Sequence, residues 1–193
     1  MKLKNIKINQ KLLIEFISVT FAVFLGLMLN QWKDNQNNQK LASQSITNIR
    51  AEIDTNSARV KAMIDSHKMM VSRLDSVNSL STEKYEQDNF SLSLDFKIIS
   101  STSWETAKLT QAITYMDYDV VSEIANLYHY QNYYESFVKE YVNKNIYVKS
   151  NVSYKEYVEN MQRFLNAIIP IEKRLMDYYK QILNELPGGM KDE

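Results

Sequence analysis

The sequence predicts an all-α protein, in which an N-terminal transmembrane helix continues into a long heptad-patterned helix that packs with about three further helices as a bundle. Three observations lead to this fold class. The 193 residues include only three Gly and two Pro, and both are unfavourable inside helices. A nearly continuous apolar run occupies residues 12–29. Beyond it, apolar residues recur every three and four positions, which is the period of a helix.

The composition excludes several classes of function. Acidic and basic residues balance at 23 each, so no net charge draws the chain to nucleic acid. The absence of Cys excludes disulfides, thiolate catalysis and thiolate metal sites. The two histidines, His67 and His129, stand alone, and no phosphate loop, G-x-S-x-G or H-E-x-x-H motif occurs. We therefore predict no enzymatic activity, with no catalytic, cofactor-binding or metal-binding residue and no nucleic-acid partner.

Residues 12–32 are predicted to cross a membrane. About 20 helical residues span the hydrocarbon layer, and this segment has that length. Trp32 follows the apolar run at the position of an interfacial anchor. The alternative is a buried helix of a soluble protein, which is usually shorter or has a polar face.

The flanking charges predict the orientation of this span. Residues 1–11 form a basic N-terminus with four lysines and no acid, whereas Lys33 and Asp34 follow the span. The positive-inside rule places the N-terminus in the cytoplasm and everything after Trp32 outside it. A cleaved signal peptide is the alternative, but the apolar run is longer than usual and no A-x-A-like site follows it. The pattern favours an uncleaved signal anchor.

A stripe of small residues marks one side of the predicted span. Glu15, Ser18, Ala22 and Gly26 share a helix face, and the last three allow a second transmembrane helix to approach closely. The Glu15 carboxylate has three interpretations: a headgroup-level charge near Lys11, a polar contact with a partner helix, or a proton-carrying group. We favour a role in orienting or pairing the anchor.

Residues 33–80 are predicted to form a long helical stalk, with a candidate hinge in the Asn/Gln tract at 34–39. Asn56 and His67 interrupt its apolar seam, and the charged residues Arg50 and Glu52 are expected on its polar face. The pattern fits either a coiled coil between chains or packing against later helices of the same chain, and the second needs no partner. The seam consists of Ala42, Ile46, Ile49, Ile53, Asn56, Val60, Met63, His67, Met70, Leu74 and Val77.

Residues 81–193 are predicted to form a helical bundle domain that includes an irregular connector at 81–101. Capping boxes at Thr102 with Glu105 and at Ser153 with Glu156 predict two helix starts. Pro170 is expected to kink or restart the last helix. We expect helices over residues 102–116, 120–143 and 153–186. Their expected inward side chains include Trp104, Leu109, Ile113, Met116, Ile124, Leu127, Tyr128, Tyr134, Phe137, Tyr141, Tyr157, Met161, Phe164, Leu165 and Ile168.

Ten of the 13 tyrosines lie between Tyr115 and Tyr157. Such a row is either amphipathic core, with hydroxyls that reach water, or a surface that stacks on ligands or sugars. The first interpretation is the commoner one. Tyr130 and Tyr133 lie off the inward face, so we expect them to form an exposed contact patch for a partner.

A resemblance to small uncharacterised bacterial single-pass membrane proteins is carried by "LIEFISVTFAVFLGLMLNQWKDNQNNQ", "NIRAEIDTN" and "SWETAKLTQAITYMDYDVVSEIANLYHYQ". That family pairs a Glu-containing span ending in Asn-x-Trp with a helical domain. Together with the orientation predicted from the flanking charges, the resemblance implies a place in the bacterial inner membrane, with the C-terminal domain in the periplasm. It implies no activity, because the family has none assigned. The family's usual glycine within "AKLTQAITYM" is Gln111 here.

These features predict a membrane-anchored, non-catalytic interaction or scaffold subunit of a membrane complex. Its expected partners are lipid and either another protein or a second copy of the chain, bound through the transmembrane and stalk helices. One alternative is a ligand-sensing bundle outside the cytoplasm that signals through a partner protein. Another is an accessory subunit of an ion-conducting or motor complex, which depends on Glu15 alone.

Overall fold

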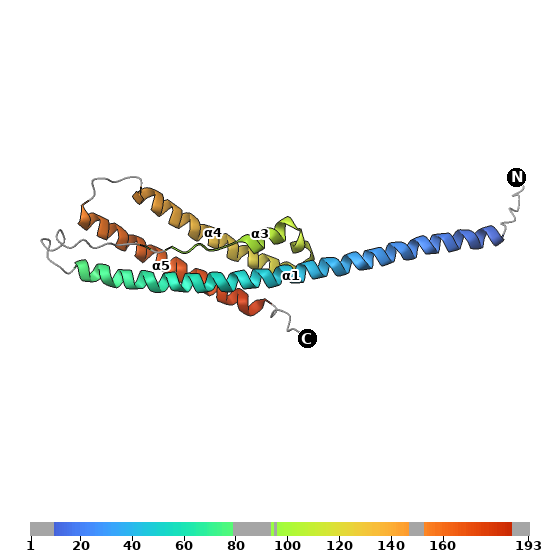
Figure 1. The fold of residues 1–193 in the computed structure, drawn as a ribbon, viewed down its shortest axis with the longest axis horizontal. Coiled ribbons are helices and arrows are strands. Elements are labelled where there is room, and N and C mark those ends of the chain that lie inside the picture. The colour runs from blue at the N-terminus through green and yellow to red at the C-terminus, as the bar shows by residue number, and fades with distance from the viewer. Residues whose placement is uncertain (1–9, 79–93, 95, 147–152, 187–193) are drawn as a thin grey trace, which may run out of the picture.

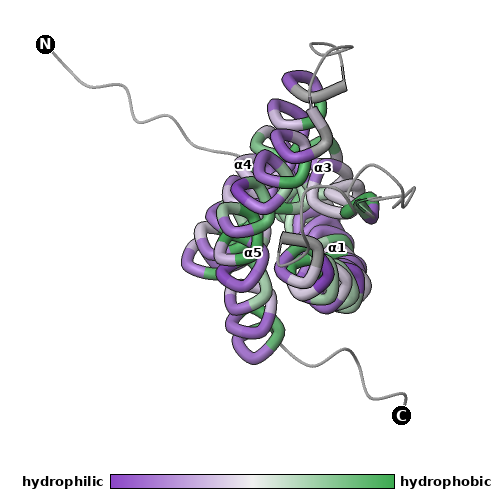
Figure 2. The backbone as a smooth tube through the Cα atoms, turned by 90° about the vertical axis from the view of Figure 1, so that its left-hand side faces the viewer, coloured by the Kyte–Doolittle hydropathy of each residue, from purple (hydrophilic) through white to green (hydrophobic). Residues whose placement is uncertain are grey.

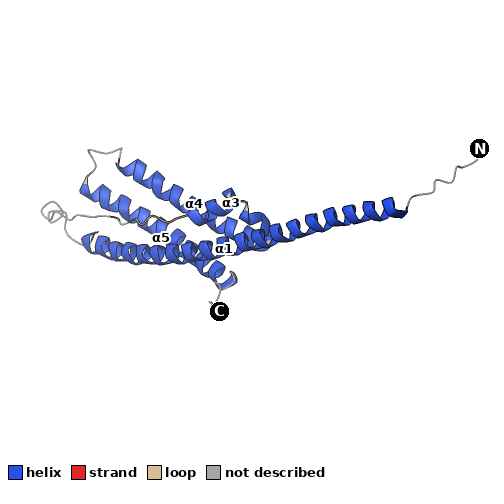
Figure 3. Ribbon diagram, turned by 45° about the vertical axis from the view of Figure 1, so that its right-hand side comes forward, coloured by secondary structure: helices blue, strands red, loops and turns tan. Residues whose placement is uncertain are grey.

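The computed structural model describes residues 10–78, 94, 96–146 and 153–186, and these are overwhelmingly helical (Figures 1 and 3). No strand occurs in these ranges, so the predicted all-α fold is confirmed. Figure 2 shows hydrophobic and hydrophilic residues alternating along the helices, as amphipathic packing requires. The elements in order are α1 (Gln10–Asn78), α3 (Thr102–Leu109), the 3-10 helix η1 (Ala112–Tyr115), α4 (Tyr118–Ile146) and α5 (Tyr154–Glu185).

Helix α1 is a single helix of 69 residues, about 100 Å long. It passes without interruption through residues 34–39, so the Asn/Gln tract is not a break in the helix. Its first part projects away from the bundle, and its second part packs against the other helices (Figure 1). Residues 11–37 are all exposed, and burial begins near residue 42.

The heptad seam of α1 is the side that packs within the chain. Its positions from residue 42 to residue 74 are buried, except that Ile46 is half-buried. The side chain of Val77 lies outside the described part of the chain. Both polar seam residues, Asn56 and His67, are fully buried. The preferred alternative, packing against later helices of the same chain, is therefore the arrangement that the structure adopts.

Helices α1 and α5 run antiparallel. The start of α5 lies beside the end of α1, where Gln162 Nε2 donates to Asp75 Oδ1 over 2.7 Å. The end of α5 lies beside the middle of α1, where Arg50 reaches the carbonyl of Leu186 over 2.8 Å. Helix α4 packs on α5. The last turns of α1, the end of α4 and the start of α5 thus form the end of the bundle farthest from residues 12–32 (Figure 1).

The expected helix over 102–116 is broken in the structure. Helix α3 ends at Leu109, and Gln111 adopts a left-handed conformation with φ of 59° before η1 begins. Leu109 is 83% exposed, so its predicted burial is wrong. The left-handed turn redirects the chain and places Ala112, which the sequence pattern did not single out, in the core.

Replacing Gln111 by glycine is expected to stabilise the protein by about 0.5–1 kcal/mol, because a side chain disfavours the left-handed region that glycine adopts readily. Replacement by valine is expected to have the opposite sign, since a branched Cβ is strained there. Thermal unfolding of the full chain, followed by circular dichroism, measures both. A glycine variant that melts below the parent would contradict the assignment of strain.

Helices α4 and α5 match their predicted ranges closely. Ser153 caps α5, and its hydroxyl accepts from the Glu156 backbone N–H over 3.3 Å, as predicted. Pro170 lies inside α5, which continues through it, so Pro170 does not restart the helix. Tyr157 is 41% exposed and was wrongly expected in the core. Val158 takes the inward position instead, one residue later in the helical period.

The described end of the connector is irregular, as predicted, and it lies along α1. The Lys97 backbone N–H donates to Met63 Sδ over 3.1 Å, and Arg59 Nη1 donates to the Ile98 carbonyl over 2.8 Å. Residues 81–93 and 95 of the predicted connector lie outside the described residues. The contacts of residues 96–100 hold the start of α3 against α1.

Candidate functional site

The first part of α1 carries an exposed apolar surface. Its large apolar side chains between residues 12 and 32 are 42–70% exposed, and no described part of the bundle covers them. In the described ranges, α1 is the one helix long and apolar enough to cross a membrane. A continuous apolar patch of this size marks a surface for lipid or for protein. Trp32, 61% exposed, closes it.

The predicted small-residue stripe lies on this exposed surface. Glu15, Ser18, Ala22 and Gly26 are all exposed, and a Cβ added at Gly26 would meet no atom within 4 Å. The hydroxyl of Thr20 donates to the Phe16 carbonyl over 2.8 Å, which satisfies this polar group inside the helix. The stripe is therefore open for contact, and its role stays a prediction.

A half-buried carboxylate, Glu52, joins α1 to α3 and α4. Its Oε1 accepts from the Tyr128 hydroxyl over 2.6 Å, and its Oε2 accepts from the Ser100 hydroxyl over 2.7 Å and the Ser103 backbone N–H over 2.9 Å. The negative charge of Glu52 at the first turn of α3 also interacts favourably with the dipole of this helix. Burial, together with the bond to Glu52, raises the pKa of Tyr128, so this hydroxyl stays a donor.

The cap of α3 differs from the predicted capping box. Ser101 is the N-cap and makes no side-chain cap bond, and Thr102 is already inside the helix. Glu105 pairs with Lys108 over 2.8 Å instead of reaching back. Glu52 on α1 supplies the missing acceptor, so the cap is tertiary and not local.

Asn56 binds the connector in the way that a neighbouring strand would. Its Nδ2 donates to the Ser100 carbonyl over 2.7 Å, and its Oδ1 accepts from the Ser100 N–H over 2.9 Å. Gln131 donates to the same carbonyl over 3.1 Å and accepts from the Tyr179 hydroxyl over 2.8 Å. Asn56, Gln131 and Tyr179 are fully buried, and each is hydrogen-bonded. This polar network specifies one packing of α1, α4 and α5.

His67 and Glu172 form a fully buried pair. His67 Nδ1 lies 3.0 Å from Oε1 and 3.1 Å from Oε2 of Glu172, and the two side chains are 1% and 0% exposed. The Tyr134 hydroxyl donates to the same carboxylate over 3.4 Å. Phe96 packs edge-on against the imidazole. Because a buried polar side chain is destabilising without a hydrogen-bond partner, each member of the pair depends on the other.

Arg50 binds the C-terminal end of α5. Its Nη1 donates to the carbonyls of Leu183 and Leu186, each over 2.8 Å. The last carbonyls of a helix lack hydrogen-bond partners inside the helix, and a cation at this end interacts favourably with the helix dipole. Arg50 and Glu52 therefore hold opposite ends of two different helices against α1.

Tyr130 and Tyr133, predicted as a contact patch, form one cluster with two residues of α5. The ring of Tyr130 lies 5.8 Å from that of Tyr133 and 5.2 Å from that of Tyr178. The guanidinium of Arg174 lies 5.8 Å from the Tyr130 ring and 5.9 Å from the Tyr178 ring. Tyr133 is 51% exposed, and Tyr130 and Tyr178 are half-buried. We call these four residues the tyrosine–arginine cluster.

No family model, curated protein or solved structure matches this chain. The resemblance to bacterial single-pass membrane proteins therefore stays a prediction.

Sequence reasoning missed several residues that hold the bundle together. Arg50 and Glu52 were expected on the polar face of the stalk, but each flanks the buried seam and meets a helix end of another segment. Gln131 and Glu172 are fully buried polar residues inside amphipathic helices. Their positions on the inward faces of α4 and α5 were the available signal, since a polar residue in an apolar stripe needs a buried partner.

Proposed function

We propose that this chain is a membrane-anchored, non-catalytic interaction or scaffold subunit of a membrane complex. One observation carries the proposal: α1 has a wholly exposed apolar first part and a second part that is built into the core of a helical bundle. Because the helix is continuous, the bundle stands at a set distance from the apolar segment. A continuous helix of this kind can hold the surface of the bundle at a fixed distance from a membrane.

Lipid is the proposed partner of residues 12–32. More than ten Leu, Ile, Val and Phe in this segment each favour insertion by roughly 0.3–0.6 kcal/mol, which outweighs one carboxylate at roughly 2.5–3.5 kcal/mol. The lysines of residues 1–11 support a cytoplasmic N-terminus. We accordingly propose a single-pass protein of the bacterial inner membrane, as the family resemblance implies, with the bundle in the periplasm.

The tyrosine–arginine cluster is the proposed contact with a protein partner. Tyr and Arg are enriched among the residues that dominate binding energy at interfaces. Here the rings and the guanidinium already pack on one another, so binding would order few additional side chains. Glu15 is the sole ionisable residue between 12 and 32, so an ion-conducting role has no second titratable group in the span.

A photoreactive phenylalanine analogue placed at Tyr133 is expected to give one constitutive cross-linked product in membranes, formed without added ligand. Placement at Tyr118, a tyrosine at the start of α4 that is even more exposed, at 82%, provides the control and is expected to give none. Adding Arg174→Ala is expected to reduce the product at Tyr133 severalfold, because the rings lose their cation–π partner. Mass spectrometry identifies the partner. Equal yields at both positions would contradict the proposed interface.

Ligand sensing is the second candidate, and one specific feature favours it. A pocket of about 380 Å³ lies between α4 and α5. Cross-links at Tyr133 that appear only with a ligand would support sensing over a constitutive scaffold.

A further inference from the structure

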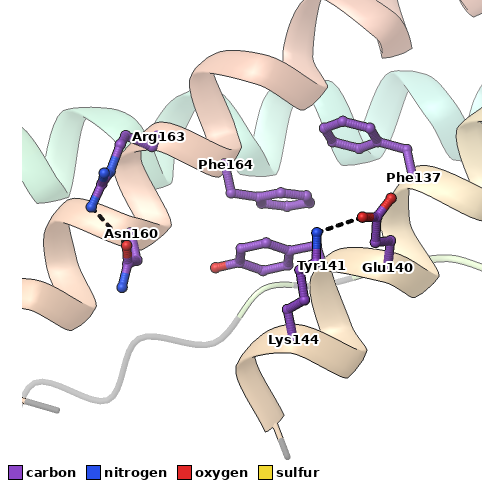
Figure 4. A pocket seen from close by; sticks show the side chains of 7 residues that line it. All are labelled: Phe137, Glu140, Tyr141, Lys144, Asn160, Arg163 and Phe164. Atoms are coloured by element: carbon purple, nitrogen blue, oxygen red, sulfur yellow. Dashed lines mark hydrogen bonds and ion pairs between the residues drawn. The ribbon is translucent and has the colours of Figure 1, made fainter. Parts of the chain in front are cut away.

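The pocket between α4 and α5 is built from both helices at the end of the bundle farthest from residues 12–32 (Figures 1 and 4). Its volume of about 380 Å³ lies at the lower end of the range for small-molecule sites. Such a volume holds a molecule with one or two rings. The lining residues are Phe137, Glu140, Tyr141 and Lys144 from α4, and Asn160, Arg163 and Phe164 from α5.

The base of the pocket is aromatic. The rings of Tyr141 and Phe164 stack with an interplanar angle of 16° and centroids 3.5 Å apart, and Phe137 stacks on Phe164 at 5.9 Å and 16° (Figure 4). Burial, and to a lesser degree the nearby Tyr157, raises the pKa of Tyr141 to about 12, so its hydroxyl stays uncharged at neutral pH. A planar, uncharged base of this kind favours a flat apolar group.

The two polar walls differ in charge. On α4, Lys144 pairs with Glu140 and lowers the pKa of that carboxyl group, so this wall is ionised but balanced. On α5, Arg163 Nη2 donates to Asn160 Oδ1 over 2.8 Å, and its Nε donates to the Glu159 carbonyl over 3.4 Å. Among the described residues, no carboxylate forms an ion pair with Arg163. The pocket therefore has one positive charge in excess, held in place by a neutral amide.

We propose that this pocket binds a small aromatic carboxylate, whose ring packs against Phe137, Tyr141 and Phe164 and whose carboxylate pairs with Arg163. A guanidinium presents parallel N–H donors that match a carboxylate, and a bound carboxylate would neutralise the excess charge. The opposite choice, a cationic ligand, would place a second positive charge beside Arg163 and find Glu140 already paired.

The ligand is a soluble molecule and not a lipid of the anchoring membrane. Gln162, next to Arg163, bonds Asp75, which is 43 residues beyond Trp32 on the same helix. That separation is about 65 Å along α1, far more than a headgroup can reach. The exclusion of a membrane lipid depends on the proposed membrane span, whereas the chemistry of the pocket does not.

Isothermal titration calorimetry on the full chain in lipid nanodiscs tests the proposal, with indole-3-acetate as the probe. We expect a dissociation constant below about 1 mM. Tryptamine has the same ring with the opposite charge, and cyclohexaneacetate has the same charge without an aromatic ring. Both are expected to bind at least about tenfold more weakly. A parallel titration into empty nanodiscs measures the partition of each probe into lipid, and its heat is subtracted from the signal.

Arg163→Gln is expected to weaken the binding of indole-3-acetate at least about tenfold, because it removes the cation from an exposed position without disturbing the core. Arg73→Gln removes another exposed arginine, from α1, and is the matched control, with unchanged binding expected. Unaltered circular dichroism shows that both variants fold. The proposal is overturned by equal binding of tryptamine or cyclohexaneacetate, by full affinity in Arg163→Gln, or by no binding at about 5 mM probe. Loss of binding here with intact cross-links at Tyr133 would leave the scaffold proposal standing.

Discussion

Replacing His67 by leucine is expected to lower the free energy of unfolding by about 3–5 kcal/mol. The substitution leaves the Glu172 carboxylate fully buried, with the Tyr134 hydroxyl at 3.4 Å as its one hydrogen-bond partner among the described residues. A buried carboxyl group that loses its main hydrogen-bond partner is strongly destabilising, because it no longer recovers the free energy lost on leaving water. Chemical unfolding of the full chain in detergent micelles, followed by circular dichroism, gives the value.

The double variant His67→Leu with Glu172→Leu separates loss of the pair from loss of packing. Two leucines remove both members of the pair, and the Tyr134 hydroxyl keeps Met63 Sδ at 3.5 Å as an acceptor, so we expect most of the stability to return. The two positions face each other between α1 and α5, and apolar side chains can fill that space. A double variant that is as unstable as the single one would show that the size of the ring, and not its pairing, is what matters.

Replacing Glu52 by alanine is expected to cost about 2–4 kcal/mol. Three donors lose their acceptor at once: the hydroxyls of Tyr128 and Ser100 and the backbone N–H of Ser103. A hydrogen bond to a charged group contributes about 1.5–3 kcal/mol, and bonds that share one acceptor do not add fully. The Tyr128 hydroxyl loses most, since its side chain is 2% exposed.

Asp54→Ala is the matched control for Glu52→Ala. Asp54 is an exposed acid two residues further along α1, so its removal is expected to change stability by less than about 0.5 kcal/mol. A double-mutant cycle of Glu52→Ala with Tyr128→Phe then measures the coupling between the two side chains. Coupling near zero would show that Glu52 does not hold α4 against α1.

The periodic parts of the fold could be predicted from the sequence. The seam of α1 was correctly identified because burial along a helix follows a period that local composition reveals. The same reasoning found Asn56 and His67 as polar interruptions, but it could not name their partners. Those partners, Ser100 and Glu172, are 44 and 105 residues away. Contacts at such separations leave no local signal.

The errors arise where tertiary contacts overrule the local pattern. Leu109 was expected to continue an apolar face, but the left-handed turn at Gln111, two residues after the end of α3, redirects the chain and ends that face. Tyr157 was expected inward, although Val158 is in phase with Met161 and Leu165. For the pocket, the inward side chains of Phe137, Tyr141 and Phe164 were predicted. The unpaired charge of Arg163 depends on which residues face it across two helices, and the sequence does not show this.

Single-cysteine labelling tests the central claim, that residues 12–32 lie in a membrane with the bundle outside the cytoplasm. The chain has no Cys, so each introduced cysteine is the only one to react. Leu25→Cys and Lys61→Cys would be exposed to a membrane-impermeant maleimide on intact spheroplasts. We predict that the cysteine at position 61 reacts promptly and that the one at position 25 reacts only after detergent solubilisation. Labelling of position 61 only after lysis, or equal labelling of both positions in spheroplasts, would contradict the account.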